Sequence, residues 1–302
     1  MLKLKRILLI APHDMIHTAA FDRAQALASA NGALLHIVAF EFVPALAMAG
    51  LFDPGAMAQA REGYLQVHRH WLEQQARFQR CAGLRVTTEV VWATPSLAHV
   101  LEYVNDFHAD LVIKDTHHVP ALDRAFHRPL DWLLLRDCPA ALHLVTEARH
   151  PRPLKVLAAI DLSHLEELTQ GLNDRILNLA STLAASCGAV LQVLNVSHWS
   201  VVGDAPRSLP TLALDASLRD AVNDAQEEAF DVLADRYGVE KRHRHLLTGI
   251  PHAVIGQFAQ EHDVDIVVLG TACHHGFDRF TGSTAESVLN RAPCSLMIVK
   301  PT

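Results

Sequence analysis

The sequence lacks a long hydrophobic run. No apolar stretch in the 302 residues approaches the ~20 consecutive apolar residues that a membrane-spanning helix needs. The apolar residues Ile7–Ala11 follow a basic N-terminus, as they would in a signal peptide, but Pro12 ends the run too early. We therefore interpret this segment as a first β-strand and expect a cytoplasmic chain with no membrane span.

Cysteine is scarce. The chain has five cysteines, an odd number, and they are scattered rather than grouped. They are Cys81, Cys138, Cys187, Cys273 and Cys294. A disulfide framework needs paired cysteines in an oxidising compartment, so this usage favours a reducing cytoplasm.

An excess of positive charge is also absent. The 26 Lys and Arg residues stand against 33 Asp and Glu residues, which gives a formal net charge of −7 at pH 7. This balance argues against a nucleic acid or an acidic membrane as a partner. The sequence shows no Ser-His-Asp order, no paired carboxylates and no identifiable general base, so it does not support a dedicated catalytic site.

The chain does contain enough apolar residues for two hydrophobic cores. A composition of 50% hydrophobic and 20% charged residues is typical of a globular protein. A length of 302 residues predicts two domains of about 150 residues each. We place the first domain at residues 1–145 and the second at residues 155–302. Residues 146–154 form a linker that Pro151 and Pro153 stiffen.

Each half of the chain alternates short apolar strands with helices. The order β-α-β-α-β-α-β-α-β predicts an α/β fold of two tandem Rossmann-like domains. Each domain is expected to hold a five-stranded, mostly parallel sheet with helices on both faces. Gly32 and Gly188 are expected to end the first helix of each half. The apolar segment Pro44–Phe52 is expected to be a loop that covers a pocket, seals a dimer or binds an amphipathic ligand.

The two halves also share a sequence repeat. Residues 110–145 align with residues 265–300 without a gap, and Asp110 is then matched to Asp265. Thr116 then falls on Thr271, Asp123-Arg124 on Asp278-Arg279, Leu134 on Leu289 and Arg136 on Arg291. Asp115, Ala121 and His127 of the first copy take the places of Gly270, Gly276 and Gly282 of the second. The repeat therefore predicts one fold in both halves and a phosphate-binding loop in the second half alone.

The predicted phosphate loop follows the buried strand Ile266–Leu269. Gly282 and Ser283 open the helix that comes after the loop, and Ser283 with Glu286 has the spacing of a capping box. The backbone N–H groups at the start of a helix can bind a phosphate, helped by the helix dipole. In parallel sheets, ligands bind outside the carboxyl ends of the strands, where Asp161, Ser197 and Gly270 are expected.

These segments resemble the universal stress protein family, and in particular its tandem E-type members. The resemblance is carried by DLVIK and PLDWLLLRDCP in the first half and by IVVLGT and GSTAESVLNRAPCSLMIVKP in the second. It implies an adenine nucleotide alpha hydrolase-like version of the Rossmann-like fold in each domain. It also implies that Asp161, after the first strand of the second half, contacts the adenosine part of a nucleotide.

In members that bind ATP the loop follows the pattern G-x2-G-x9-G-[S/T]. Gly270 matches the first glycine, and Gly282-Ser283 match the last pair. Cys273 replaces the middle glycine, and the spacing to Gly282 is one residue short, with Gly276 inside it. The nucleotide-binding residues expected in the second half are Asp161, Val196, Gly270, Thr271, Gly276, Gly282, Ser283 and Thr284.

Histidines at equivalent loops raise the alternative of a metal site. His117-His118 in the first half and Cys273-His274-His275 in the second supply good zinc ligands. Adjacent side chains usually point apart, however, and neither a C-x2-C nor an H-E-x2-H pattern is present. We retain His117 and His118 as candidate zinc ligands beside the structural interpretation of these loops.

The sequence thus predicts a cytoplasmic stress-response protein that acts as a binding and regulatory module. Its expected ligand is an adenine nucleotide, ATP or AMP, in the second domain. One alternative is weak ATP hydrolysis, and another is a protein that binds zinc or an apolar ligand and acts through dimerisation. A homodimer is the expected assembly.

Overall fold

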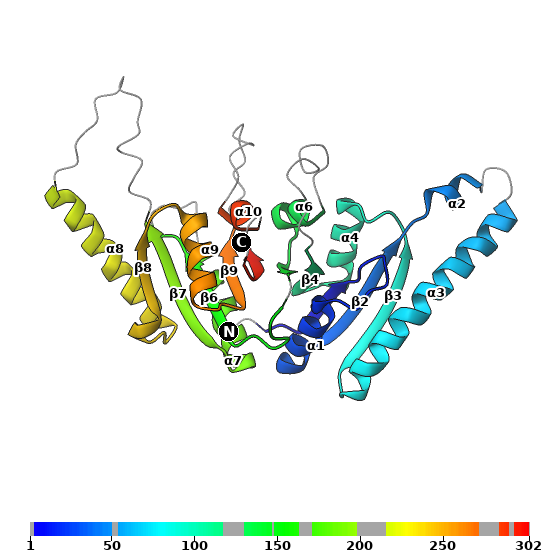
Figure 1. Ribbon diagram of the computed structural model, residues 1–302, viewed down its shortest axis with the longest axis horizontal. Helices are drawn as coiled ribbons and strands as arrows, with labels where there is room; N and C mark the ends of the chain where they lie inside the picture. Colours follow the sequence, from blue (N-terminus) through cyan, green and yellow to red (C-terminus); the bar gives the residue numbers. More distant parts are fainter. Residues whose placement is uncertain are drawn as a thin grey trace, which may run out of the picture. The chain divides into compact units, whose positions relative to one another are not determined.

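The computed structural model describes residues 3–49, 54–116, 130–146, 148–162, 171–197, 216–271, 284–289 and 293–301 (Figure 1). The side chains of residues 49, 54 and 216–223 are outside this description. The chain forms two compact units, Lys3–Arg152 and Pro153–Thr302, which we call the first and the second unit.

The first unit contains a five-stranded parallel sheet. Its strands follow the order β3-β2-β1-β4-β5, and every neighbouring pair is parallel. The strands are β1 (Arg6–Ile10), β2 (Leu34–Glu41), β3 (Arg85–Trp92), β4 (Leu111–Asp115) and β5 (Ala141–Val145). The helices are α1 (Ala19–Asn31), α2 (Pro44–Ala49), α3 (Pro54–Cys81), α4 (Leu97–Phe107) and α6 (Leu130–Asp137).

The second unit repeats this arrangement. Its strands follow the order β10-β9-β6-β7-β8, again with every neighbouring pair parallel. The strands are β6 (Lys155–Ile160), β7 (Val190–Ser197), β8 (Arg244–Thr248), β9 (Ile266–Gly270) and β10 (Ser295–Val299). The helices are α7 (Leu172–Cys187), α8 (Ala216–Arg236), the short 3-10 helix η3 (Lys241–His243), α9 (Pro251–Glu261) and α10 (Thr284–Leu289).

The predicted fold class is therefore confirmed. Parallel strands need crossover connections, and right-handed crossovers in this strand order place the helices on both faces of each sheet. Gly32 and Gly188 end α1 and α7 with φ angles of 61° and 66°, which glycine adopts without steric cost. The strands β1, β4, β6, β9 and β10 are buried along almost their whole length, as their continuous apolar sequences predict.

One expected loop is partly helical. Residues 44–49 form α2, so the interpretation of Pro44–Phe52 as a loop was wrong over its first part. The reason is local, because a proline opens the segment and alanine, leucine and methionine follow, all of which favour a helix. Residues 50–52 lie outside the described part of the chain.

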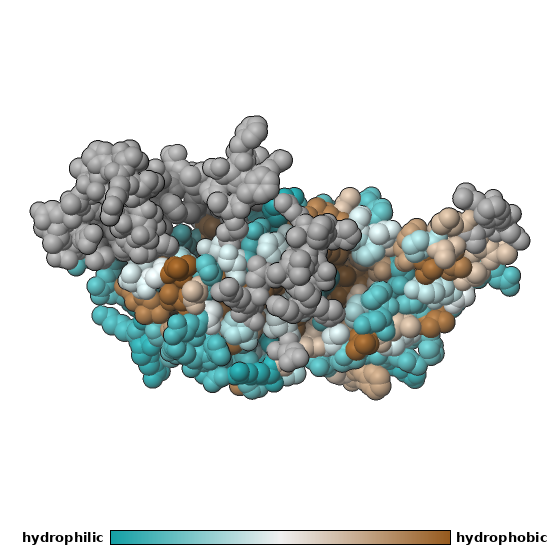
Figure 2. Space-filling model, turned by 45° about the horizontal axis from the view of Figure 1, so that its top comes forward, coloured by the Kyte–Doolittle hydropathy of each residue, from teal (hydrophilic) through white to brown (hydrophobic). Residues whose placement is uncertain are grey.

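Exposed apolar side chains are scattered over the first unit. Met48 lies on α2, and Val67 and Phe78 lie on α3, each more than half exposed. Figure 2 shows brown areas over the part of this unit that carries α2 and α3. Single exposed apolar side chains are normal on a soluble surface, so they do not by themselves define a docking site.

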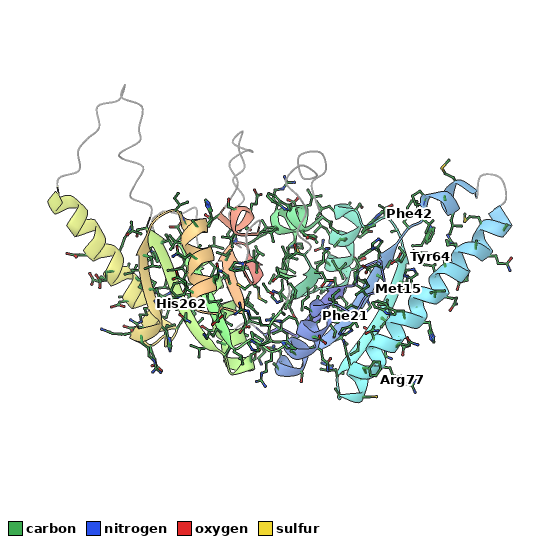
Figure 3. The ribbon with its side chains drawn as sticks, viewed as in Figure 1. Met15, Phe21, Phe42, Tyr64, Arg77 and His262 are labelled. Atoms are coloured by element: carbon green, nitrogen blue, oxygen red, sulfur yellow. The ribbon has the colours of Figure 1, made fainter. Side chains whose placement is uncertain are left out.

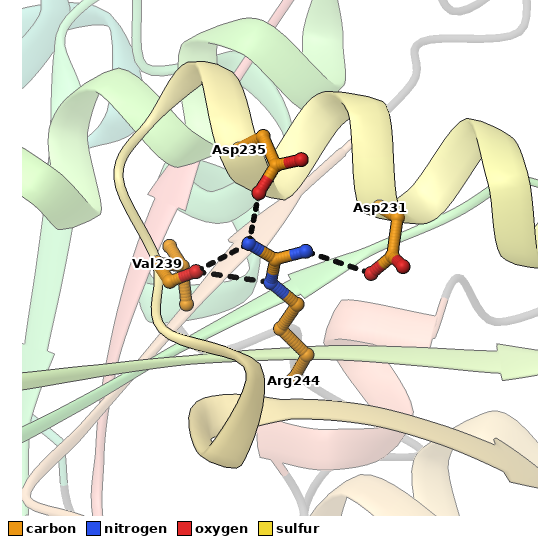
Figure 4. Close-up of polar contacts among 4 residues, drawn as sticks. All are labelled: Asp231, Asp235, Val239 and Arg244. Atoms are coloured by element: carbon orange, nitrogen blue, oxygen red, sulfur yellow. Dashed lines mark hydrogen bonds and ion pairs between the residues drawn. The ribbon is translucent and has the colours of Figure 1, made fainter.

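Arg244 links the edge strand β8 to the end of α8 through hydrogen bonds and ion pairs (Figure 4). Its side chain is 7% exposed, and Nη1 donates to Oδ1 of Asp231 at 2.7 Å. Nη2 pairs with Asp235, while Nε and Nη2 donate to the carbonyl oxygen of Val239 at 2.9 and 2.6 Å. One guanidinium thus holds two carboxylates one helical turn apart and a turn carbonyl.

We predict that Arg244→Met destabilises the second unit by about 2 kcal/mol, because it strips a buried carbonyl and two carboxylates of their charged donor. Arg242→Gln is the control, since the pair between Arg242 and Glu240 is largely exposed and contributes little. Calorimetric unfolding of the full chain measures the stability of both variants. Amide exchange of residues 244–248 locates the change. Equal effects of the two substitutions would contradict the role of Arg244.

Candidate ligand site at the carboxyl edge of the second sheet

The strands β6 and β9 part at their carboxyl ends. Pairing joins Val156–Ala158 to Ile266–Val268 and then stops, although both strands continue, to Ile160 and Gly270. The chain connections leave these two neighbouring strands in opposite directions, which makes this the switch point of the sheet. Ligands of parallel α/β sheets bind at such a point, outside the carboxyl ends.

At its carboxyl end, each of these strands is hydrogen-bonded to its other neighbour in the sheet, β6 to β7 and β9 to β10. β6 pairs with β7 as far as Ile160 and Asn195, and the backbone N–H of Leu162 then donates to Oδ1 of Asn195 at 3.1 Å. β9 pairs with β10 to its end, and the N–H of Thr271 donates to the carbonyl oxygen of Val299 at 2.9 Å. Beyond Ala158 and Val268 the two strand ends are therefore bonded to their outer neighbours, and the described residues show no pairing between them.

Asp161 lies at this opening with its backbone fixed by an asparagine of α7. The N–H of Asp161 donates to Oδ1 of Asn173 at 3.1 Å, and Nδ2 of Asn173 donates to the carbonyl oxygen of Asp161 at 2.7 Å. The residue itself is exposed. The paired bonds therefore fix the position of a carboxylate that solvent, or a ligand hydroxyl group, can reach.

Gly270 has a structural role that the phosphate-loop interpretation did not include. A Cβ atom at this position would come within 2.7–2.9 Å of the side chain of Leu172, at the start of α7. Leu172 is buried, so it has little room to move away. The close approach of β9 to α7 thus requires glycine, whether or not a phosphate binds nearby.

Three more of the predicted residues lie in the described part of the chain. Val196 is almost fully buried near the end of β7, and Thr284 is exposed at the start of α10. Thr271 is 5% exposed, and its Oγ1 atom has no hydrogen-bond partner among the described residues. A buried hydroxyl without a partner is costly, so Thr271 is the predicted residue most suited to a ligand contact.

The remaining predicted site residues lie outside the described ranges. These are Gly276, Gly282, Ser283, His117 and His118. Among the residues that the structure describes, no group of three or more His, Cys, Asp or Glu side chains is arranged to hold a metal ion. In the same residues no helix is long and apolar enough to cross a membrane.

Sequence reasoning missed the two asparagines that shape the opening. Asn195 is 1% exposed within the apolar strand β7, and an amide in such a strand is the signal that could have identified it. Asn173 had no comparable signal, because a polar residue in the first turn of a helix is ordinary. Its role follows only from the proximity of α7 to the end of β6.

The equivalent edge of the first unit carries different chemistry. Asp115, in the place of Gly270, is buried at the end of β4. Lys114 Nζ donates to the carbonyl oxygen of Asp115 at 2.8 Å and lies 2.8 Å from Oδ1 of Asp131. β1 and β4 stay paired up to Ile10 and Lys114, one residue pair further than β6 and β9.

A buried carboxylate also lies at the end of β2. Glu41 is 2% exposed, and it accepts a hydrogen bond of 2.8 Å from the hydroxyl of Tyr64 on α3. Its Oε1 lies 3.2 Å from Nδ1 of His68, which is also buried. Figure 3 labels Tyr64 and Phe42, which lie near the ends of the strands of this unit. Burial raises the pKa of the Glu41 carboxyl, while the Tyr64 hydrogen bond and the charges of His68 and His13 oppose the rise.

Comparison with known proteins identifies relatives along most of the chain. Residues 154–300 match the model of the universal stress protein family. The chain is 28% identical over 261 residues to universal stress protein E of Escherichia coli, which covers 84% of this chain and 80% of that protein. It is 24% identical over 262 residues to the universal stress protein E homolog of Haemophilus influenzae, covering 84% and 82% of the two chains.

Solved structures share the fold over the full length. A protein of unknown function from Pseudomonas aeruginosa superposes with a TM-score of 0.74 at 23% identity, covering 99% of this chain and 93% of that one. A universal stress protein from Archaeoglobus fulgidus superposes with a TM-score of 0.63 at 17% identity, covering 99% and 97%. At these identities the likeness shows the fold.

The contact at Gly270 generates a stability prediction. Gly270→Ala should destabilise the second unit by about 1–3 kcal/mol, because the added methyl group overpacks the start of α7. Gly256→Ala in α9 is the control, since a Cβ there meets nothing within 4 Å, and it should be neutral or stabilising. Urea unfolding of both variants tests this, and a Gly270→Ala variant as stable as wild type would contradict the close approach.

The burial of Glu41 generates a pH prediction. Because its pKa is raised in the folded protein, its contribution to stability is fully present below its unfolded pKa and is lost as the pH rises through the folded pKa. The stability of wild type relative to Glu41→Gln should therefore decrease as the pH rises above about 4.3, the ordinary value for a glutamate.

For Glu62→Gln we expect the opposite dependence of stability on pH. Glu62 is exposed, and the hydrogen bond from Arg69 lowers its pKa, so wild type should gain relative stability with rising pH. Urea midpoints of wild type and both variants between about pH 4 and pH 7 compare the slopes. If the stability difference changes with pH in the same direction for both variants, burial is not the dominant influence on the pKa of Glu41.

Proposed function

This chain belongs to the universal stress protein family, and on that premise we propose that it is a stress-response binding and regulatory protein whose second unit binds an adenine nucleotide, ATP or AMP. The observation that carries the proposal is the parting of β6 and β9 at the switch point. In a parallel sheet this is the place where backbone groups and strand-end side chains are available to a ligand.

The residues around the opening suit the parts of a nucleotide. The exposed carboxylate of Asp161, fixed by Asn173, can accept hydrogen bonds from ribose hydroxyl groups. Val196 supplies apolar surface near the end of β7. The Oγ1 atom of Thr271 can pair with a ligand oxygen at the start of the predicted phosphate loop. Gly276, Gly282 and Ser283 would complete that loop in this proposal.

The first unit is proposed not to bind nucleotide. At its switch point β1 and β4 pair for one residue more than β6 and β9 do. Lys114 there pairs with the carboxylate of Asp131 and donates to the backbone carbonyl oxygen of Asp115, a second buried acidic residue at the end of β4. A phosphate would meet negative charge there, which is unfavourable in a partly buried site.

Two further expectations stay predictions. A homodimer and a zinc ion held by His117 and His118 are neither supported nor opposed by the described residues. Weak ATP hydrolysis, the alternative activity, has no specific observation in its favour.

We predict that the full-length chain binds one ATP or AMP and that Thr271→Val weakens this binding about tenfold. The substitution keeps the side-chain shape and removes a hydroxyl that has no partner among the described residues, so the fold should stay as stable as wild type. Asp161→Ala should weaken binding by a similar factor, because it removes a carboxylate acceptor. Isothermal titration calorimetry with each nucleotide measures the affinities.

Asp14→Ala is the matched control. Asp14 is exposed in the corresponding loop after β1 of the first unit, so its loss should leave the affinity unchanged. Incubation with ATP followed by chromatography of the nucleotide distinguishes binding from hydrolysis. An affinity that falls for Asp14→Ala and not for Thr271→Val or Asp161→Ala would refute the second-unit site.

A further inference from the structure

A second concave site lies in the second unit, at the opposite end of its sheet. It is a cleft of ≈ 560 Å³ between the middle of α7, the start of β7 and the turn that joins α8 to β8, and we call it the α7–α8 cleft. Ligand sites for small molecules commonly have volumes of about 300–1,000 Å³. Val190 and Leu191 at the start of β7 form part of its wall, about 23 Å along the strand from Ser197 at the carboxyl edge.

The turn that forms one wall is held in place from several directions. Arg244 binds the carbonyl oxygen of Val239, a lining residue of the cleft (Figure 4). The hydroxyl of Tyr237 donates to Oδ1 of Asp174 at 2.7 Å and accepts from Nδ2 of Asn178 at 3.0 Å. Burial and the Asp174 carboxylate raise the pKa of Tyr237 to about 12, so this hydroxyl keeps its proton. The cleft is therefore formed before any ligand binds, which lowers the entropic cost of binding.

One polar atom in the wall has no hydrogen-bond partner in the part of the chain that the structure describes. Ser181 lines the cleft from α7, and its Oγ atom is buried without a hydrogen-bond partner among the described residues. A serine in a helix usually returns its hydroxyl to the carbonyl of the preceding turn, as Thr182 does with Asn178 at 2.7 Å. The Ser181 hydroxyl thus has no bond to a described residue to lose, and pairing it with a ligand group would remove the cost of leaving it unsatisfied.

The rim of the cleft is richer in positive charge than the chain as a whole. Its formally charged lining residues are Arg236, Arg242 and Glu240, in a protein of net charge −7. Arg236 pairs with Asp174 and Arg242 with Glu240, at 2.9 and 2.8 Å, but all four side chains are more than 40% exposed. Exposed ion pairs contribute little, so either guanidinium can turn to an anion that enters the cleft.

Apart from Asn178 and His243, the rest of the lining is apolar. Ala184, Val190 and Leu191 face the cleft, and Val190 is 43% exposed although it starts a sheet strand. An apolar group placed there would cover surface that water now contacts. The arrangement therefore combines an apolar floor, one unsatisfied hydroxyl and two arginines at the rim.

We propose that the α7–α8 cleft is a second ligand site, which takes a small amphipathic carboxylate. The apolar body of the ligand lies on Ala184, Val190 and Leu191, its carboxylate pairs with Arg236 and Arg242, and Ser181 bonds to a polar atom of the ligand. The site is separate from the proposed nucleotide site, because it lies at the amino end of the strands and uses none of the residues at the carboxyl edge.

The test uses two probes of the same shape and different charge, naphthalene-1-acetate and the neutral naphthalene-1-acetamide. Each is titrated into the full-length protein, with calorimetry for the affinity and amide NMR shifts for the location. The acetate should bind once per chain and shift the amides of residues 178–191 and 236–243. The acetamide should bind about fivefold more weakly, because it lacks the charge-assisted hydrogen bonds.

Variants of the cleft residues test which side chains bind which part of the probe. The double variant Arg236→Gln/Arg242→Gln should reduce acetate affinity to that of the acetamide and leave acetamide binding unchanged. Its fold should be retained, since both arginines are exposed. Lys241→Gln is the matched control, because Lys241 lies in the same turn, carries the same charge and does not line the cleft. Ser181→Leu should abolish binding of both probes by filling the cleft.

The proposal is overturned if the two probes bind equally to the wild-type protein, or if the shifted amides lie outside the cleft. It is also overturned if Lys241→Gln weakens binding of the acetate probe as much as the double arginine variant does. The effect would then come from net charge alone. Addition of ATP in a parallel titration separates this site from the nucleotide site, since each ligand should shift its own set of amides.

Discussion

The opening at the second switch point depends on the side-chain amide of Asn195. It is buried in β7 and accepts from the N–H of Leu162, which extends the alignment of β6 with β7 beyond the last strand residue. On the other side the N–H of Thr271 continues the pairing of β9 with β10. Because a backbone N–H has one hydrogen atom, neither of these two N–H groups is available for a bond across the switch point.

The two units show how one backbone can serve different chemistry. The N–H of Thr116 bonds to Val145 at 2.9 Å, as the N–H of Thr271 bonds to Val299 at the same distance. The side chains at equivalent strand ends nevertheless differ, with Asp115 in one unit and Gly270 in the other. The first unit fills its edge with buried polar groups that already have partners, whereas in the second Thr271 Oγ1 has no partner among the residues that the structure describes.

Helix α7 contributes to both sites of the second unit. Its first turn supplies Leu172, which packs on Gly270, and Asn173, which fixes Asp161. Its middle supplies Ser181 and Ala184 to the α7–α8 cleft. One helix therefore positions residues at both proposed sites, and Arg244 holds the wall of the cleft that faces α7.

Much of the fold could be predicted from local patterns. The alternation of apolar strands and helices was sufficient for two five-stranded parallel sheets, and Gly32 and Gly188 marked helix ends through their φ preferences. Local propensity also contained the information for α2, although Pro44–Phe52 was interpreted as a loop. These features depend on residues close together in the sequence, which is why sequence reasoning reaches them.

The sites depended on contacts between distant residues. The sequence placed Asp161 and Gly270 at strand ends, but the bonds from Asn173 and Asn195 and the contact with Leu172 join different elements. The same holds for Glu41 with Tyr64 and His68, and for Ser181 opposite the turn at Val239. The sequence by itself determined which residue types stand at the edge of each sheet. Only the tertiary structure decided which of them meet and which polar atoms keep a partner, because partner choice is set by packing across elements far apart in the chain.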